Sequence, residues 1–467
     1  MKIYNSLTKR KEEFEPIEAG KVKMYACGIT VSGEAHIGHA YQALIYDIMR
    51  KYLQKLGYRV TYARNYTDVD DKIIAKSKET GIPADVYAAE MIGKIDEVMR
   101  KFRVDDPDVW LKATENIGNI LSFIAELIEK GHAYATKKGD VYFDVDTYPA
   151  YGHLSNRNIE DALDGVRVDN DDEKKNAYDF ALWKSAKEGE ICWDSPWGKG
   201  RPGWHIECSG ISMKHLGEDL DIHCGGIDNA FPHHTNEIAQ SESYLGHHWC
   251  NWWVHVLHLN TTSGKMSKSS GEFLTVSLLQ EKGYDPLVYR LFCLQSHYRK
   301  SLVFSWENLD NAAGAYQKLI ARIAALKPGD GEVDAEAQAA LREKFRTALD
   351  NDLNTSLAVT ALYDVLKYKT NDATKLSLLG EFDQVLSLSL LEKAEEKRQE
   401  AAKTSTSTAG GYTVTGEGDS AIDALVLQRG EAKKAKNFAE ADRIRDELKA
   451  QGIEITDVPG GAVWKRV

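Results

Sequence analysis

Residues 22–64, VKMYACGITVSGEAHIGHAYQALIYDIMRKYLQKLGYRVTYAR, carry the pattern that predicts the fold class. Residues 22–27 are mostly apolar and predict a buried strand. Apolar side chains recur at spacings of three and four over about residues 37–56, which predicts a helix that ends at Gly57. Residues 59–64 predict a second strand, so the stretch forms a right-handed βαβ unit of a parallel sheet. No G-x-G-x-x-G follows the first strand, which argues against a dinucleotide-binding fold of the dehydrogenase kind.

Composition limits the class of protein. The 467 residues are enough for about three domains, and the net charge of −12 argues against a protein that coats nucleic acid by bulk attraction. No run of about 18 apolar residues occurs, and the first residues lack the apolar core of a signal peptide. The six cysteines are scattered, which favours metal or catalytic roles over a disulfide framework. We therefore expect a cytoplasmic protein without a membrane segment.

Shifts in composition divide the chain into segments. Pro- and Gly-rich stretches and a charge run indicate an insertion in the sheet, helix-forming residues follow it, and a segment rich in Ser, Thr and Gly predicts a flexible linker. We expect the first half of the sheet domain at 1–114, the insertion at 115–200, the second half at 201–305, a helical bundle at 306–400, the linker at 401–419 and a small C-terminal domain at 420–467.

Four residues are candidates for a metal site. His233 and Glu237 are four residues apart and follow Pro232, which suits the first turn of a helix, so they would project from one helix face. Cys27 ends the first predicted strand, where parallel sheets place ligands, and Cys208 lies in a second apolar segment. Two thiolates, an imidazole and a carboxylate form a plausible zinc sphere. Alternatively, both cysteines fill the core, since free cysteine is often buried.

Two further segments suggest phosphate handling. His36, Gly38 and His39 begin the first helix, where free N–H groups attract phosphate. Far downstream, the segment GKMSKSSG contains Lys265 and Lys268 and is suited to neutralising charge on a leaving pyrophosphate. Taken singly, the histidines are typical of a helix surface and the lysines of a solvated loop.

Together, HIGH after a first strand and KMSKS downstream resemble the signature pair of class I aminoacyl-tRNA synthetases. Other segments narrow the resemblance to the cysteinyl-tRNA synthetase family, from Asn5 to about Arg466. These segments are CGITV (27–31), NYTDVDDK (65–72), RPGWHIEC (201–208) and FPHHTNEIAQ (231–240).

The resemblance implies an α/β fold, with a Rossmann-like parallel-sheet catalytic domain and an insertion, then an α-helical bundle that binds tRNA and a small C-terminal anticodon-binding domain. It implies a cysteine–tRNA ligase that activates L-cysteine with ATP, forming cysteinyl-adenylate and pyrophosphate, and then transfers cysteine to the 3′ end of tRNA(Cys). It also implies one Zn²⁺ per chain, Mg²⁺ carried with ATP, and a monomer.

Residue roles follow from the same resemblance. The zinc ligands match Cys27, Cys208, His233 and Glu237, and the substrate thiolate would add to them. His36, Gly38 and His39 would bind ATP, while Lys268, with Lys265 in support, would stabilise charge on its β- and γ-phosphates. Residues around the cysteine and adenylate pocket match Thr67, Trp204, His205, His223 and Asp228.

The chain departs from the family pattern near the active-site mouth. The family usually has an aromatic-acidic pair before HIGH, where this chain has Ser32-Gly33-Glu34, and an arginine after it, where this chain has Ala40-Tyr41-Gln42. Cys224 stands where glycine is common, and we expect it not to bind the metal. These departures concern the placement of the tRNA acceptor end and the catalytic efficiency.

The C-terminal tail bears on two rival functions, an ATP-dependent ligase that joins cysteine to an amino sugar and a non-catalytic, zinc-dependent RNA-binding protein. The amino-sugar ligase needs no anticodon-reading tail, and the binding protein needs no pyrophosphate loop. Residues 421–467 hold nine Lys and Arg against eight Asp and Glu, a net of +1 in an acidic chain. They include a basic amphipathic helix over 433–445 and an aromatic, Trp464, that could stack on an unpaired base.

Overall fold

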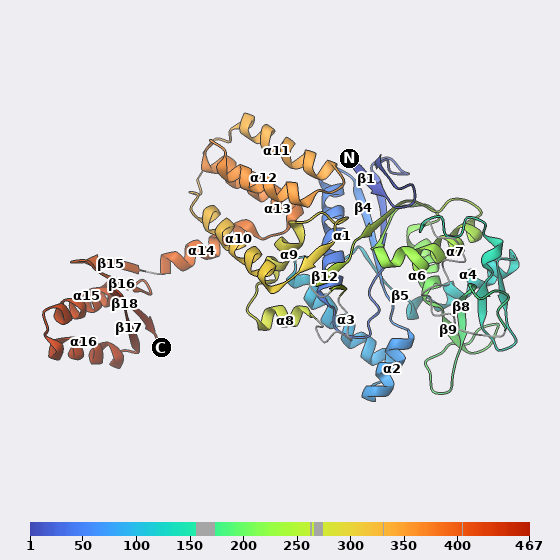
Figure 1. Ribbon diagram of the computed structural model, residues 1–467, viewed down its shortest axis with the longest axis horizontal. Coiled ribbons are helices and arrows are strands. Elements are labelled where there is room, and N and C mark those ends of the chain that lie inside the picture. Colours follow the sequence, from blue (N-terminus) through green and yellow to red (C-terminus); the bar gives the residue numbers. More distant parts are fainter. Residues whose placement is uncertain (156–172, 262–263, 266–273, 330, 404) are drawn as a thin grey trace. The chain divides into compact units, whose positions relative to one another are not determined.

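The computed structural model describes residues 1–155, 173–261, 264–265, 274–329, 331–403 and 405–467. These residues form two compact units (Figure 1). The larger unit comprises Met1–Tyr316 and Val333–Leu388, and the smaller unit comprises Gln317–Glu332 and Ser389–Val467. None of the described helices has the length and apolarity that crossing a membrane requires.

A parallel sheet, five-stranded in the described residues, forms the centre of the larger unit in the order β11-β10-β3-β4-β5. Helix α1 (Ile37–Lys55) connects β3 to β4, which confirms the βαβ unit and the α/β fold predicted from residues 22–64. Ligands bind at the carboxyl ends of strands where the strand order reverses, and here that point lies between β3 and β10. The strands are β3 (Lys21–Ala26), β4 (Arg59–Tyr66), β5 (Val109–Lys112), β10 (Leu220–Gly226) and β11 (Cys250–Val256).

Helices cover both faces of this sheet. α1 lies on one side, and α6 (Trp204–Leu216) and α7 (Thr235–Leu245) lie on the other (Figure 1). Between β5 and α6 the chain forms α4 (Ile117–Glu129) and an antiparallel sheet in the order β6-β7-β8-β9. Its strands are β6 (Ala133–Ala135), β7 (Val141–Phe143), β8 (Phe180–Ser185) and β9 (Gly200–Pro202).

The remaining elements complete the larger unit. Side chains that accept hydrogen bonds from backbone N–H groups begin several of its helices, among them Asp70 before α2 and Asn354 before α12. The boundary between the units falls within α10 (Trp306–Ala324). The other strands are β1 (Lys2–Asn5), β2 (Arg10–Glu13), β12 (Leu259–Thr261), β13 (Gly264–Lys265) and β14 (Leu302–Phe304). The other helices are α2 (Asp71–Thr80), α3 (Ala84–Lys101), α8 (Val276–Glu281), α9 (Pro286–Leu294), α11 (Ala335–Asp350), α12 (Thr355–Lys367) and α13 (Asp372–Leu386).

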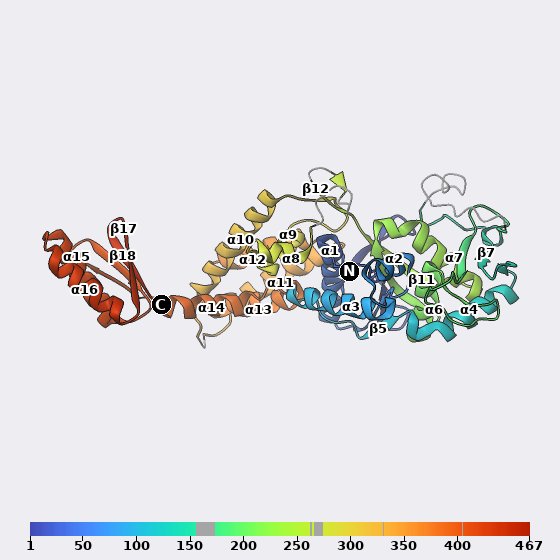
Figure 2. The same ribbon diagram turned by 90° about the horizontal axis from the view of Figure 1, so that it is seen from below.

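The smaller unit contains a sheet in the order β15-β16-β18-β17, and α15 and α16 cover one face of it (Figure 2). The prediction of a flexible linker at 401–419 is wrong, because β15 and β16 pair as a hairpin. Alternating Thr and Val side chains suit strands, and Gly410-Gly411, both with positive φ, suit a tight turn. The elements are α14 (Leu390–Lys403), β15 (Ser405–Ala409), β16 (Tyr412–Gly416), α15 (Ser420–Lys434), α16 (Phe438–Ala450), β17 (Ile453–Val458) and β18 (Gly461–Arg466).

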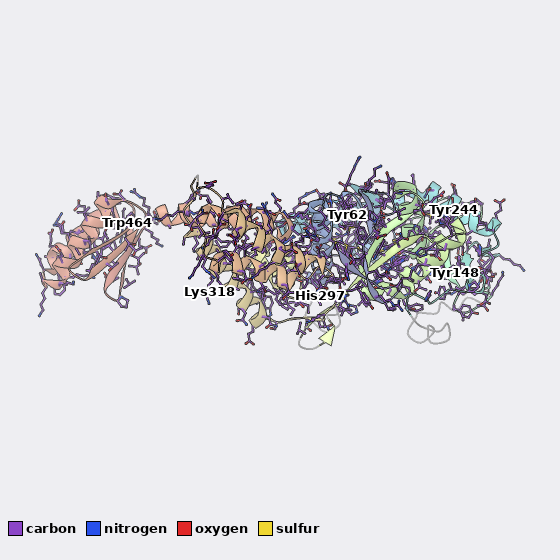
Figure 3. All side chains as sticks on the ribbon, turned by 90° about the horizontal axis from the view of Figure 1, so that it is seen from above. Tyr62, Tyr148, Tyr244, His297, Lys318 and Trp464 are labelled. Carbon is purple, nitrogen blue, oxygen red and sulfur yellow. The ribbon has the colours of Figure 1, made fainter. Side chains whose placement is uncertain are left out.

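Trp464 belongs to the core of this unit, so the expectation that it stacks on a base is wrong (Figure 3). The side chain is 1% exposed, and its Nε1 donates a hydrogen bond of 2.7 Å to Asp423. A tryptophan on a strand of a small unit supplies much of the apolar area that the unit can bury. The exposed aromatic side chain is instead Phe438, at the start of α16, which is 62% exposed.

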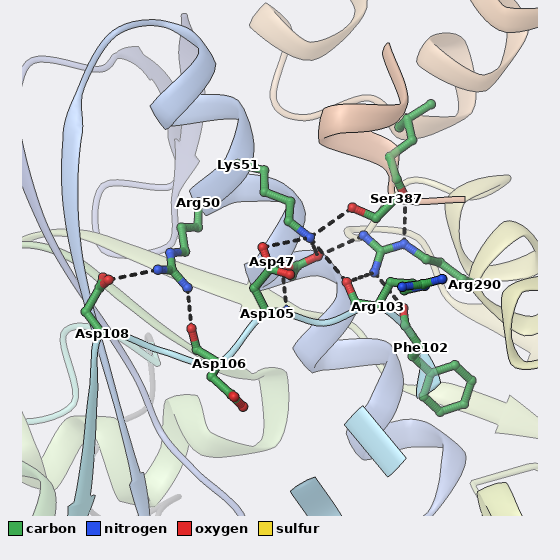
Figure 4. A network of polar contacts seen from close by, with 11 residues as sticks. Asp47, Arg50, Lys51, Phe102, Arg103, Asp105, Asp106, Asp108, Arg290 and Ser387 are labelled. Atoms are coloured by element: carbon green, nitrogen blue, oxygen red, sulfur yellow. Dashed lines mark hydrogen bonds and ion pairs between the residues drawn. The ribbon is translucent and has the colours of Figure 1, made fainter. Parts of the chain in front are cut away.

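A buried arginine joins four segments of the larger unit (Figure 4). The Arg290 guanidinium, fully buried in α9, contacts the Asp47 carboxylate of α1 at 2.8 Å. It also donates hydrogen bonds to the carbonyl oxygens of Phe102, Arg103 and Leu386. Because one guanidinium contacts all of these acceptors, it fixes α1 against α9 and the end of α13.

Replacing Arg290 by Met should leave the Asp47 carboxylate partly uncompensated in the core. We expect the free energy of unfolding of the larger unit to fall by about 3–5 kcal/mol in urea denaturation. Arg342, whose surface ion pair with Glu381 is 2.7 Å long, is the control: Arg342→Met should cost less than about 1 kcal/mol. Equal losses for the two variants would contradict this account of the network.

Candidate functional site

A cleft of about 680 Å³ lies at the carboxyl ends of the central strands, beside the point between β3 and β10 where the strand order reverses. It brings together most of the site residues predicted from the sequence, although they come from distant parts of the chain. The predicted residues that line it are Cys27, His36, Gly38, His39, Thr67, Trp204, Cys208, Asp228 and His233.

The four predicted metal ligands form one buried cluster. Cys27 follows β3, Cys208 lies in α6, and Glu237 lies in the first turn of α7. His233 lies in a wide helical turn, Ala230–His234, so α7 begins later than the sequence suggested for Pro232. All four ligand atoms lie within 4.8 Å of one another, and the arrangement can hold a metal ion.

Distances within the cluster match the edges of a small coordination sphere. The Cys27 and Cys208 Sγ atoms are 3.8 Å apart, and the Cys208 Sγ is 3.5 Å from the His233 Nε2. The Glu237 Oε1 is 3.0 Å from the His233 Nε2 and 3.4 Å from the Cys27 Sγ. Thiolate, imidazole and carboxylate ligands in a tetrahedral set are typical of zinc.

A second set of possible ligands overlaps the first: Cys27, His223, His234 and Glu237. The His234 Nε2 is 3.4 Å from the Cys27 Sγ, and the His223 Nε2 is 2.7 Å from the Glu237 Oε2. In the first set Cys27, Cys208 and His233 line the cleft, whereas in the second set Cys27 does so. A metal held by the first set is therefore the one that a ligand in the cleft can reach.

Sequence reasoning missed His234 and its partner His255. The His234 Nδ1 lies 2.8 Å from the His255 Nε2 of β11, and all of these histidines are buried. His223 was predicted to line the substrate pocket, but it lies behind the cluster against Glu237 and outside the cleft lining. Groups in such positions orient metal ligands. The doubled histidine after Pro232 was the available signal for His234.

Electrostatics prepare the cluster for a cation. The hydrogen bond from Cys27 lowers the pKa of the Cys208 thiol to about 6, so Cys208 is largely a thiolate at neutral pH. Burial opposes ionisation of Glu237, but His223 and His233 hold its pKa well below the usual range. Burial would lower the pKa of His233, yet Glu237 and Cys208 raise it to about 10. Metal ligands bind in their deprotonated forms, so a bound cation would displace the proton on His233.

The two signature histidines meet at the beginning of α1. The His36 Nδ1 accepts a hydrogen bond of 3.3 Å from the His39 backbone N–H, which caps the helix. The two imidazole rings stack with centroids 3.5 Å apart. Because both residues line the cleft, the positive end of α1 faces the same space as the metal cluster.

The remaining predicted residues divide into three groups. Trp204 is 42% exposed and stacks on His233 with ring centroids 4.4 Å apart, while His205 lies outside the cleft lining, its Nδ1 2.9 Å from the His233 Nδ1. Lys268 lies outside the described residues, and for Lys265 the structure gives the backbone of β13 and not the side chain. Cys224 is buried and belongs to neither ligand set in the described part of the chain.

Both departures from the family pattern reach this cleft. Ser32, Gly33, Glu34 and Gln42 line it, whereas the Tyr41 side chain is fully buried. Arg64 lines it as well and was not predicted. The signal that could have identified it was a charged residue near the carboxyl end of β4, where parallel sheets place ligands.

Comparison with known proteins places this site in a family. Residues 13–314 match the family described as tRNA synthetases class I (C) catalytic domain, and residues 344–390 match the DALR domain. A protein of Syntrophotalea carbinolica named Cysteine--tRNA ligase is 44% identical and covers 100% of this chain and 99% of its own length. One of the same name from Methylococcus capsulatus is 44% identical over 100% of both chains. The chain belongs to the cysteine–tRNA ligase family.

A solved structure agrees with this family's class I fold. The methionyl-tRNA synthetase of Mycobacterium tuberculosis, in complex with methionyl-adenylate, has a TM-score of 0.58 at 13% sequence identity. The match covers 82% of this chain and 93% of that chain. At this identity the likeness concerns the fold, which a cysteine–tRNA ligase shares.

Removing one thiolate tests the metal cluster directly. We expect Cys208→Ser to lose its bound metal on dialysis, measured by elemental analysis, because a hydroxyl is a poor zinc ligand at neutral pH. Cys224→Ala is the matched control, since Cys224 is equally buried and belongs to neither ligand set among the described residues, and it should keep the ion. Full retention of metal by the Cys208 variant would refute the ligand assignment.

Proposed function

We propose that this chain catalyses the cysteine–tRNA ligase reaction, activating L-cysteine with ATP and esterifying the 3′ end of tRNA(Cys). The observation that carries the proposal is the buried Cys, Cys, His and Glu cluster, which opens into the same cleft as the start of α1. A thiol bound at the cluster and a triphosphate bound at α1 would share one space.

Zinc is the metal that we propose for Cys27, Cys208, His233 and Glu237, one ion per chain. Cysteine and serine are nearly isosteric, and pocket shape distinguishes such small differences by only about 1–3 kcal/mol. Bound zinc supplies a soft Lewis acid that favours a thiolate over a hydroxyl. The ligand set therefore explains how cysteine is selected over serine by its affinity for the metal and not by its size.

The side chains of the cleft would bind and orient the reactants. The cysteine carboxylate oxygen forms a bond to the α-phosphorus of ATP, and the bond to the β-phosphate breaks with release of pyrophosphate. His36, Gly38 and His39 would hold the triphosphate at the positive end of α1, with Mg²⁺ carried by the ATP. Lys268, supported by Lys265, would stabilise charge on the leaving group.

Transfer completes the reaction. The terminal adenosine hydroxyl of the tRNA attacks the acyl carbon, and AMP leaves. Thr67, Trp204 and Asp228 line the cleft and would contact cysteine and the adenylate. His205 and His223 contact the metal ligands His233 and Glu237, so their proposed role is to orient those ligands.

The segments outside the cleft would bind tRNA. We assign catalysis to 1–114 and 201–305, the connective insertion to 115–200, tRNA binding to the helices of 306–400 and anticodon binding to 420–467. In this last segment the exposed Phe438 follows Lys433, Lys434 and Lys436 in the sequence, a combination suited to stacking on a base beside its phosphates. A monomer in the cytoplasm fits this assignment.

The two rival functions find no support in the comparisons. Neither an amino-sugar ligase nor a non-catalytic RNA-binding protein explains relatives that match over the full chain and bear the name Cysteine--tRNA ligase. One assay gives a different result for each of the three functions.

ATP–pyrophosphate exchange with L-cysteine and L-serine, followed by charging of tRNA, is that assay. We expect exchange with cysteine to exceed exchange with serine by at least about 10⁴ in kcat/KM, because faithful translation requires it and no editing segment is evident. Cysteine should then be transferred to tRNA(Cys). Exchange without charging would favour the amino-sugar ligase, and absence of exchange would favour a binding protein; either would contradict the proposal.

A further inference from the structure

Arg64 lies at the carboxyl end of β4, in the wall of the cleft. Its backbone pairs with Ala26, the residue before Cys27, so it lies one strand away from the metal cluster. The side chain is 5% exposed and lines the cleft. A permanent positive charge is therefore almost completely buried at the edge of the reaction space.

Other buried arginines of the described chain have carboxylate partners. Arg290 contacts Asp47 at 2.8 Å, Arg201 contacts Asp71, and Arg429 forms two bonds with Asp457 at 2.7 and 3.0 Å. Burying a charge without a partner is costly, which explains these pairs.

Arg64 differs from them. Within the described residues its side chain makes no hydrogen bond or ion pair, and its Nε is buried without a partner. Burial raises the pKa of the neighbouring Tyr46 and Tyr62 phenols despite the opposing Arg64 charge, so these neighbours are neutral. The Asp96 carboxylate, which feels the same charge, accepts its hydrogen bond from Tyr66. An unpaired, buried guanidinium that faces a cleft indicates an anionic ligand.

We propose that Arg64 binds the anionic oxygens at the reacting end of the substrate, the cysteine carboxylate and the α-phosphate with which it reacts. This inference rests on the proposed function. In cysteine the carboxylate carbon is three bonds from the sulfur, so a thiol at the cluster keeps the carboxylate within the cleft that Arg64 also lines. A planar guanidinium can hold a carboxylate or phosphate by two parallel hydrogen bonds. Arg64 thereby fixes the attacking oxygen and neutralises charge as the two anions approach each other.

The test compares Arg64→Met with wild-type protein by calorimetric titration of L-cysteine and of cysteamine, which has the thiol and amine but no carboxylate. We expect the variant to bind L-cysteine about 10- to 100-fold more weakly and cysteamine equally well, since a charge-assisted hydrogen bond is lost. Unchanged cysteine binding with a slower ATP–pyrophosphate exchange would assign the contact to the α-phosphate. Arg64→Lys should recover part of the lost function.

The control is Lys76→Met. Lys76 also lines the cleft, but it is more exposed and already pairs with Glu79 at 2.7 Å, so its loss should leave both affinities unchanged. The unfolding temperature separates binding from structure: because Arg64 has no partner among the described residues, Arg64→Met should be at least as stable as wild type. Wild-type affinities and exchange rate in this variant, or a parallel loss of stability, metal and cysteamine binding, would overturn the proposal. Absence of exchange in the wild-type protein would instead contradict the proposed function.

Discussion

The Glu237 carboxylate is completely buried, and each of its oxygens contacts a histidine from a different part of the fold. Oε1 also lies 3.4 Å from the Cys27 Sγ. An ionised carboxylate is tolerated in such a place when positive charge compensates it. The cluster around this carboxylate brings together the end of β3, the middle of α6, the start of α7 and the middle of β10.

Further histidines surround the metal ligands. His223, His205 and His234 contact the metal ligands, and His255 contacts His234, so the cluster has little freedom to distort. Farther away, a second buried charge pair, Asp47 with Arg290, fixes α1, whose first turn carries His36 and His39. Two separate electrostatic networks within one unit thus hold the metal cluster and the start of α1 in place.

Local patterns predicted local structure well. The βαβ unit of residues 22–64 follows from helical periodicity between two apolar runs, and the structure confirms it. Spacing could not bring Cys27 to Cys208, since 181 positions separate them and their contact depends on how the sheet closes. The prediction of a flexible linker was wrong because Ser and Thr occur in strands as well as in loops. The prediction that Trp464 is accessible was wrong because the sequence does not show which face of a strand is covered. Arg64 was missed because its lack of a side-chain partner among the described residues can be seen only in the folded chain.

We propose that the metal of this cluster selects cysteine by binding its sulfur directly. X-ray absorption at the zinc edge measures this most directly, because it counts sulfur neighbours of the ion. We expect two sulfur ligands in the free protein, from Cys27 and Cys208, three after addition of L-cysteine and two after addition of L-serine. An unchanged sulfur count with L-cysteine would contradict it and would make the cluster a purely structural site.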